Sequence, residues 1–127
     1  EHILEMVRYG ATKVELGVQS VYDDVLIRMR RGHSIADTIE ATKLLKDSAF
    51  KVGYHVMPGL PGSSFGRDVE MFKELFSNDA FKPDYLKIYP TLVVEGTELY
   101  EWWKMGEYKP YTTEEVVNLI ARAKRYL

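Results

Sequence analysis

The sequence contains no cysteine among its 127 residues. No disulfide is therefore possible within it, and no thiolate is available to bind zinc or an iron–sulfur cluster. Its three histidines form no HExxH pattern, so we predict no self-contained metal site. The length is sufficient for one compact domain with a core, but a complete eight-fold β/α barrel needs roughly 200 residues or more.

Long apolar runs and a strong excess of one charge are also missing. No run of about 18 apolar residues and no signal peptide is present, so we expect no membrane span, no membrane partner and a cytoplasmic location. The net charge of −2 provides no overall attraction to nucleic acid or to anionic lipid. A nucleic acid bound mainly through another domain remains compatible with this composition.

The residues that are present follow a repeated strand–helix order. This order predicts parallel βαβ units with right-handed crossovers and hence an α/β fold. Ser34 is a suitable N-cap with Asp37 three residues later, and Thr113 is the expected cap of the last helix. Strands are predicted over residues 12–20, 52–57 and 84–89, and helices over 1–10, 21–31, 35–48, 68–76, 97–105 and after Thr113.

A stretch rich in proline and glycine, PGLPGS, ends the second predicted strand at residues 58–63. Proline cannot donate to a sheet ladder, and glycine tolerates backbone conformations that other residues resist. We predict a tight loop at the carboxyl end of a strand, where α/β folds bind ligands. The stretch lacks the GK[ST] ending of a Walker loop, and an ordinary strand-to-helix turn is the alternative.

Each predicted strand carries polar side chains on one face. Glu15 and Gln19 share a face of the first strand, His55 lies on the second, and Lys87 and Tyr89 share a face of the third. Buried parallel strands are usually apolar on both faces, so this pattern predicts the wall of a barrel lumen or an active-site cleft. Such a set suits a polar ligand or acid–base chemistry. The alternatives are an exposed sheet face and a Glu15–Lys87 ion pair that closes a barrel floor.

Two further groups of residues are candidates for binding. The basic run at 28–31 is predicted to be a solvated helix end, except that Gly32 allows Arg31 to turn back over the strand ends. The aromatic residues near the carboxyl end are expected to form a small packed cluster, with base stacking as the less favoured alternative. This second group consists of Tyr100, Trp102, Trp103, Tyr108 and Tyr111.

Six motifs in order resemble the radical SAM domain of the Elongator catalytic subunit (elongator protein 3) family. They are VELGVQSVYDDVL from residue 14, RRGH from 30, YHVMPGLPGS from 54, DYLKIYP from 84, EGTELY from 95 and YKPYTTEE from 108. The resemblance covers nearly the whole chain. It implies an α/β fold: the last three strand–helix units of a (β/α)6 barrel, with residues 1–127 forming the C-terminal part of that domain.

The resemblance also implies cofactors and partners. S-adenosylmethionine (SAM), a [4Fe–4S] cluster and an acetyltransferase-like domain that uses acetyl-CoA together modify the wobble uridine of tRNA at C5, toward carboxymethyluridine. Other Elongator subunits are possible partners in a eukaryote. The family's three-cysteine motif and its acetyltransferase domain are expected outside these residues. We therefore expect the chain alone to be inactive, to yield no 5′-deoxyadenosine from SAM, and to self-associate through an uncovered barrel face.

The wider superfamily, which includes the oxygen-independent coproporphyrinogen oxidases, implies roles for individual residues. By position, Gln19 and His55 match residues that contact the SAM ribose, and Arg31 matches an arginine that binds the SAM carboxylate. His55 stands where those relatives have aspartate, and a neutral imidazole offers one donor and one acceptor instead of two anionic oxygens. Glu15, which shares a strand face with Gln19, is the fourth cofactor-binding candidate.

Lys87 and Tyr89 are the catalytic candidates, and they keep a second enzyme class open. A lysine on a strand near Glu15 and Tyr89 is also compatible with a barrel lyase that forms a Schiff base at Lys87. Borohydride trapping with carbonyl substrates separates that lyase from a radical enzyme. A non-catalytic interaction module is the third possibility, and cysteines upstream in the parent gene would count against it.

Overall fold

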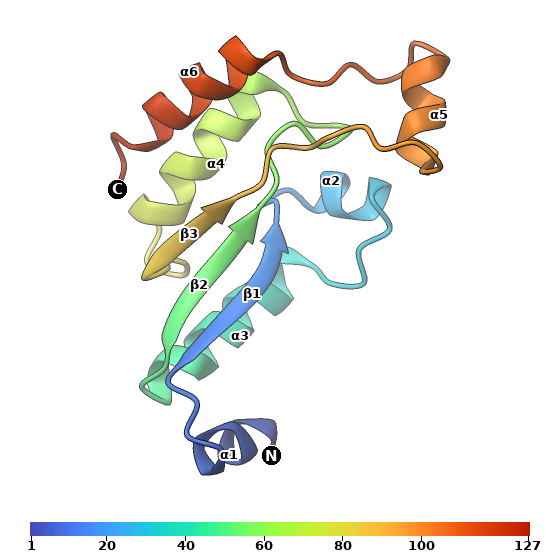
Figure 1. The fold of residues 1–127 in the computed structure, drawn as a ribbon. Coiled ribbons are helices and arrows are strands. Elements are labelled where there is room, and N and C mark those ends of the chain that lie inside the picture. The colour runs from blue at the N-terminus through green and yellow to red at the C-terminus, as the bar shows by residue number, and fades with distance from the viewer.

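The computed structural model describes residues 1–127 as one layer of strands and one layer of helices with further helices beyond them (Figure 1). None of the helices has the length and apolar character needed to cross a membrane. In chain order the elements are α1 (His2–Arg8), β1 (Lys13–Gln19), α2 (Asp23–Arg28), α3 (Ile35–Asp47), β2 (Lys51–Val56), α4 (Phe65–Ser77), β3 (Tyr85–Ile88), α5 (Glu98–Lys104) and α6 (Thr113–Ala123).

The three strands form a parallel sheet in the order β1-β2-β3, as the strand–helix alternation predicted. The register places Glu15, Gly53 and Tyr85 in one row across the sheet. His55 lies beside Lys87 two residues further along β2 and β3. Because side chains alternate along a strand, all five residues belong to the same face. The expected α/β class with parallel strands is confirmed.

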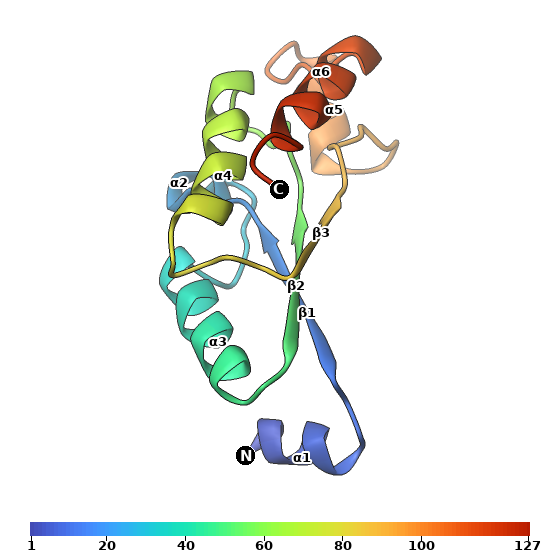
Figure 2. The same cartoon turned by 90° about the vertical axis from the view of Figure 1, so that its left-hand side faces the viewer.

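Helices cover only the other face of the sheet. Figure 2 shows α2, α3 and α4 on one side of the strands, while α5 and α6 lie toward the strands' carboxyl ends. Val52, Tyr54 and Val56 of β2 point into this helical layer and are completely buried. The Tyr54 hydroxyl is paired with Thr42 Oγ1 of α3 at 2.5 Å, so this completely buried phenol has a partner.

The helix that precedes β2 begins as the sequence predicted. Ser34 Oγ accepts the N–H of Asp37 at 3.2 Å, and the Asp37 carboxylate accepts the N–H of Ser34 at 2.7 Å. This reciprocal pair is a capping box, and it confirms both residues as helix-start signals.

Three other helix boundaries differ from the prediction. The helix expected over residues 21–31 ends at Arg28, and Arg30 soon after it adopts a left-handed φ of 52°. The helix expected from Asp68 begins at Phe65, because the Ser64 hydroxyl accepts the N–H of Arg67 and caps it. The Thr113 cap is wrong: Thr112 occupies that position and forms a capping box with Glu115.

Candidate functional site

The face of the sheet without a helical cover carries a cluster centred on Glu15. The Glu15 carboxylate pairs with His55 Nε2 at 2.5 Å and accepts the Tyr85 hydroxyl at 3.1 Å. Lys87 Nζ lies 2.7 Å from Glu15 Oε1 and 2.8 Å from Oε2. His55 and Lys87, which the sequence predicted on the same polar face as Glu15, therefore both contact it directly. We refer to Glu15, His55, Tyr85 and Lys87 as the Glu15 cluster.

The protonation states in this cluster follow from its contacts. The hydrogen bonds from Lys87 and then His55 lower the pKa of Glu15 from 4.5 to about 2, so the group is a carboxylate at neutral pH. The same contact raises the pKa of Lys87 above its usual range. Lys87 is thus held as an ammonium, which is a hydrogen-bond donor and not a nucleophile.

Gly53 makes room for the phenol ring of Tyr85 to cross the middle strand. A Cβ at Gly53 would lie 2.3 Å from two ring atoms of Tyr85 and 2.8 Å from its hydroxyl, far inside contact distance. With only hydrogen at this position, the ring extends across β2 and its hydroxyl reaches Glu15 on β1. Neither Gly53 nor Tyr85 was among the sequence-based site candidates.

Tyr89 lies at the edge of the cluster. Its ring centroid is 5.4 Å from that of His55, with the planes tilted by 46°. The side chain is 49% exposed on the same side of the sheet, beside Lys87. The arrangement combines an aromatic surface, an imidazole and a fixed ammonium, which together suit a flat polar ligand.

Gln19 and Arg31 form a second group at the end of β1. Gln19 has a left-handed φ of 64°, and the register between β1 and β2 shifts just before it. Arg31 turns back as expected, and its Nη2 donates to the Gly17 carbonyl at 3.3 Å. A Cβ at Gly17 would lie 3.3 Å from both Arg31 Nη2 and Gln19 Nε2. The absent side chain at Gly17 therefore leaves a cradle between an amide and a guanidinium.

The family resemblance implies SAM and an iron–sulfur cluster, and the residues present fit the first of these but not the second. An amide and a guanidinium that converge over bare backbone can bind the carboxylate and hydroxyl groups of an amino-acid nucleoside such as SAM. An iron–sulfur cluster does not fit this chain, because it contains no cysteine to ligate iron.

The PGLPGS loop is held by a buried aspartate that the sequence analysis missed. Asp68, only 2% exposed, accepts the N–H of Gly59 at 2.7 Å, the Ser63 hydroxyl at 2.5 Å and the Tyr111 hydroxyl at 2.7 Å. Tyr108 donates to the Gly59 carbonyl at 2.7 Å. The available signal was an aspartate in the first turn of a helix that follows a glycine-rich loop. Acidic residues are favourable in the first turn of any helix, so this signal does not by itself indicate a buried role.

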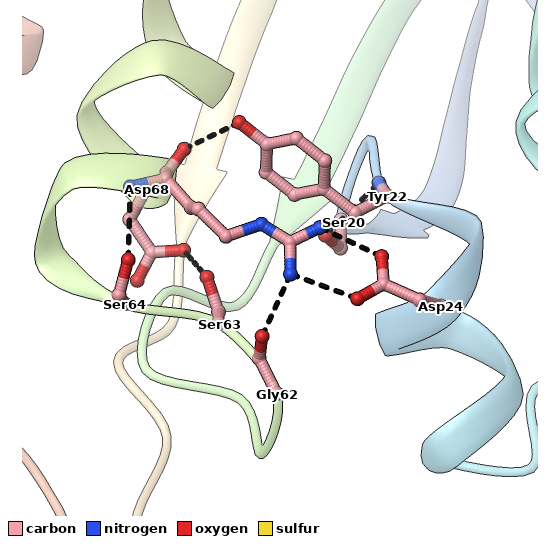
Figure 3. A network of polar contacts seen from close by, with 8 residues as sticks. Ser20, Tyr22, Asp24, Gly62, Ser63, Ser64 and Asp68 are labelled. Atoms are coloured by element: carbon pink, nitrogen blue, oxygen red, sulfur yellow. Dashed lines mark hydrogen bonds and ion pairs between the residues drawn. The ribbon is translucent and has the colours of Figure 1, made fainter.

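A second network ties the same loop to the segment after β1 (Figure 3). Arg67 pairs with both carboxylate oxygens of Asp24, at 2.7 and 2.8 Å, and donates to the Gly62 carbonyl at 2.8 Å. Its guanidinium carbon lies 4.0 Å from the centre of the Tyr22 ring, and the Tyr22 hydroxyl donates back to the Arg67 carbonyl. The connections after β1 and β2 are therefore fixed to each other.

The basic run and the aromatic residues divide between structural roles. Arg28 lies 5.6 Å from the Trp102 ring centre, and Arg30 pairs with Glu98 at 3.0 Å, so both contact the α5 region. Tyr108 and Tyr111 are hydrogen-bonded parts of the loop support, whereas the rings of Tyr100 and Trp103 contact each other within α5, so the five aromatic residues lie in two places and not in the one cluster that was expected. Burial and then the bond to Asp68 raise the pKa of Tyr111, which stays a donor.

Comparison with known proteins places this arrangement in a family. Residues 83–127 match the model of the radical SAM C-terminal domain. The chain is 60% identical over 124 residues to a tRNA uridine(34) acetyltransferase of Methanocaldococcus infernus, covering 98% of this chain and 23% of that protein. It is 52% identical over 121 residues to human Elongator complex protein 3, covering 95% of this chain and 22% of the human protein. The chain thus spans about a quarter of the length of these relatives.

The fold agrees with that of a solved relative. The structure of archaeal Methanocaldococcus infernus Elp3 with an N-terminal deletion superposes with a TM-score of 0.93 at 59% sequence identity, covering 98% of this chain and 29% of that one. The resemblance to the Elongator catalytic subunit is confirmed. Residues 1–75, more than half of the sequence, match the model of the radical SAM superfamily, and the chain belongs to that superfamily.

Proposed function

We propose that this chain is the C-terminal part of the radical SAM domain of an enzyme that modifies the wobble uridine of tRNA. The observation that carries the proposal is the 60% identity, over nearly the whole chain, to a tRNA uridine(34) acetyltransferase. The convergence of Gln19 and Arg31 over Gly17 supports it, because it provides a site for the polar groups of SAM. The [4Fe–4S] cluster, and an acetyltransferase-like domain that uses acetyl-CoA, belong to other parts of such an enzyme.

Each candidate residue has a role in this proposal. Arg31 binds the SAM carboxylate through its planar pair of N–H groups, and Gln19 hydrogen-bonds the ribose. His55 offers the ribose its second ring nitrogen, because Nε2 faces Glu15. Glu15 contributes through His55 and Lys87. SAM would supply the radical when it is bound, and these residues would hold the SAM in a fixed orientation.

The Schiff-base alternative is disfavoured by the state of Lys87. A lysine nucleophile must lose its proton, whereas the contact with Glu15 raises the pKa of Lys87. Borohydride trapping with carbonyl substrates remains the direct test, and labelling at Lys87 would favour the lyase. The non-catalytic module has no observation in its favour among the residues described.

The test of the proposed function uses the complete gene product that contains this sequence. The protein is reconstituted anaerobically with iron and sulfide, then incubated with SAM, acetyl-CoA, a reductant and a tRNA that carries uridine at position 34. Mass spectrometry of the digested tRNA should detect carboxymethylated uridine at that position. A tRNA with cytidine at 34 is the matched control. Formation of 5′-deoxyadenosine without any change to the tRNA would leave a radical SAM enzyme with a different substrate.

The isolated chain should release no 5′-deoxyadenosine from SAM and dithionite above the blank, because it has no cluster ligands. Light scattering should detect self-association of this segment. Other Elongator subunits are expected partners if the source is eukaryotic, and the cytoplasm is the expected location.

A further inference from the structure

Lys87 has hydrogen-bonding capacity that the protein does not use. An ammonium carries three N–H groups, and Lys87 Nζ makes one hydrogen bond, to Glu15 Oε2 at 2.8 Å, with Oε1 of the same carboxylate at an ion-pair distance of 2.7 Å. Glu15 is its only hydrogen-bond partner in the chain. The Lys87 side chain is 44% exposed on the face of the sheet without a helical cover. At least one N–H of Lys87 is therefore free to bind an acceptor on that side.

Glu15 itself has little capacity left for a ligand. A carboxylate has about four acceptor positions, and Glu15 uses three of them for hydrogen bonds with Tyr85, His55 and Lys87, while the Lys87 ammonium also lies against Oε1. Its function is therefore to fix its donors in place. Tyr85 contributes to the same end by reaching across Gly53, which closes the cluster on the side away from the strands' carboxyl ends.

The charge of the cluster selects the kind of acceptor. The negative charge of Glu15 offsets the positive charge of Lys87 at contact distance, so the pair has little net attraction for a phosphate. A neutral carbonyl oxygen needs only the donor. Tyr89, half-exposed next to Lys87, adds a ring on which a flat heterocycle can pack.

We propose that Lys87 donates a free N–H to a carbonyl oxygen of the uracil ring of the substrate, with Glu15 and Tyr85 as positioning residues. This inference rests on the proposed function and names the residue that recognises the base. It assigns Lys87 to the substrate and leaves Gln19 and Arg31 for SAM.

The test compares anticodon stem-loops that carry uridine, 2-thiouridine or 4-thiouridine at position 34, with the reconstituted complete gene product. Sulfur is a weak acceptor, so one thio-substitution should lower kcat/KM of the wild-type enzyme. Lys87→Met should lower kcat/KM for uridine by roughly ten- to a hundred-fold, the range of a hydrogen bond to a charged group. In Lys87→Met, kcat/KM for the same thio-substituted stem-loop should be within about two-fold of kcat/KM for the uridine stem-loop.

Three other variants guard the test against misfolding and against a merely structural role of Lys87. Lys87→Arg retains donors and charge, and should retain the thio-substitution effect. Tyr85→Phe keeps the ring but removes its bond to Glu15, so uridine activity should fall by about two- to ten-fold and the thio effect should shrink with it. Lys43→Met, an exposed change on α3 under the other face, is the matched control and should change neither.

The outcomes separate this inference from the proposed function. Absence of any modification of uridine by the folded wild-type enzyme would overturn the proposed function. Modification with thio-substitution effects that are identical in wild type and Lys87→Met would overturn the role of Lys87 alone, and would leave the Glu15–Lys87 pair as a structural floor. An equal loss for all three bases in Tyr85→Phe would remove Tyr85 as a positioning residue.

Discussion

The carboxylate of Asp68 accepts the backbone N–H of Gly59 at 2.7 Å, which joins the start of α4 to the loop that precedes it. Gly59 has a φ of 83°. This left-handed conformation is unfavourable for any residue that carries a side chain. The hydrogen bond holds this turn in place inside the protein, because Asp68 is almost completely buried. The PGLPGS loop, which the sequence analysis predicted as a ligand-binding turn, is therefore fixed at its start by this hydrogen bond.

Substitution of this aspartate should destabilise the loop and the fold together. Asp68→Asn replaces the buried carboxylate that accepts three hydrogen bonds by a neutral amide with a single acceptor oxygen, so these bonds are weakened. We expect a loss of about 2–4 kcal/mol in the free energy of unfolding. Tyr111→Phe removes one donor and should cost about 1 kcal/mol. Urea unfolding checks both, with the exposed Tyr126→Phe as control; equal stability of Asp68→Asn and wild type would contradict the network.

Addition of a single methyl group at Gly53 should disturb the sheet. In Gly53→Ala the new Cβ would meet the Tyr85 ring at 2.3 Å, so the ring must move away from Glu15. Overpacking of this kind costs about 1–3 kcal/mol of stability. Tyr85→Ser should restore much of the loss in the double variant, since the obstacle is the ring.

Gly66→Ala is the matched control for that substitution. Gly66 lies in α4, and a Cβ there meets nothing within 4 Å. Alanine is favoured over glycine in helices, so this variant should gain about 0.5–1 kcal/mol. Thermal or urea unfolding measures both. A neutral effect of Gly53→Ala would mean that Tyr85 does not cross the strand.

The contribution of Glu15 to stability should depend on pH in a defined window. Its pKa is lowered from 4.5 to about 2 in the folded protein by Lys87 and His55, so folding favours the carboxylate. The stabilisation is therefore fully present above pH 4.5 and is lost as the pH falls toward 2. The difference in unfolding free energy between wild type and Glu15→Gln should shrink over this range. A difference that stays constant with pH would show that the charge of Glu15 is not involved.

Arg31 should affect SAM binding and leave the fold unchanged. Charge-assisted hydrogen bonds contribute roughly 1.5–3 kcal/mol each, so Arg31→Ala should weaken SAM binding by about ten- to a hundred-fold in the complete, cluster-loaded gene product. Arg31→Lys should recover only part of this, since an ammonium cannot reproduce the planar pair of donors. Calorimetric titration measures the affinity. Equal binding by wild type and Arg31→Ala would remove Arg31 from the site.

The order of elements and the polar face of the sheet could be predicted from the sequence because they depend on local periodicity. Alternation along residues 13–19 and the Ser34 cap act over a few residues, and both were correct. The parallel arrangement then follows from the order of strands and helices. The six family motifs likewise identify the superfamily without reference to the fold.

The tertiary structure alone decided which of these residues touch. The position of Tyr85 across Gly53, and the four contacts to Glu15, depend on the register between three strands that are far apart in sequence. The burial of Asp68 depends on Tyr111, which is 43 residues away. Local sequence patterns do not determine contacts between residues this far apart. Strand register depends on the total packing of side chains, and that packing exists only in the folded protein. Residue type and spacing thus determined the strand face, and packing determined how each side chain on it is used.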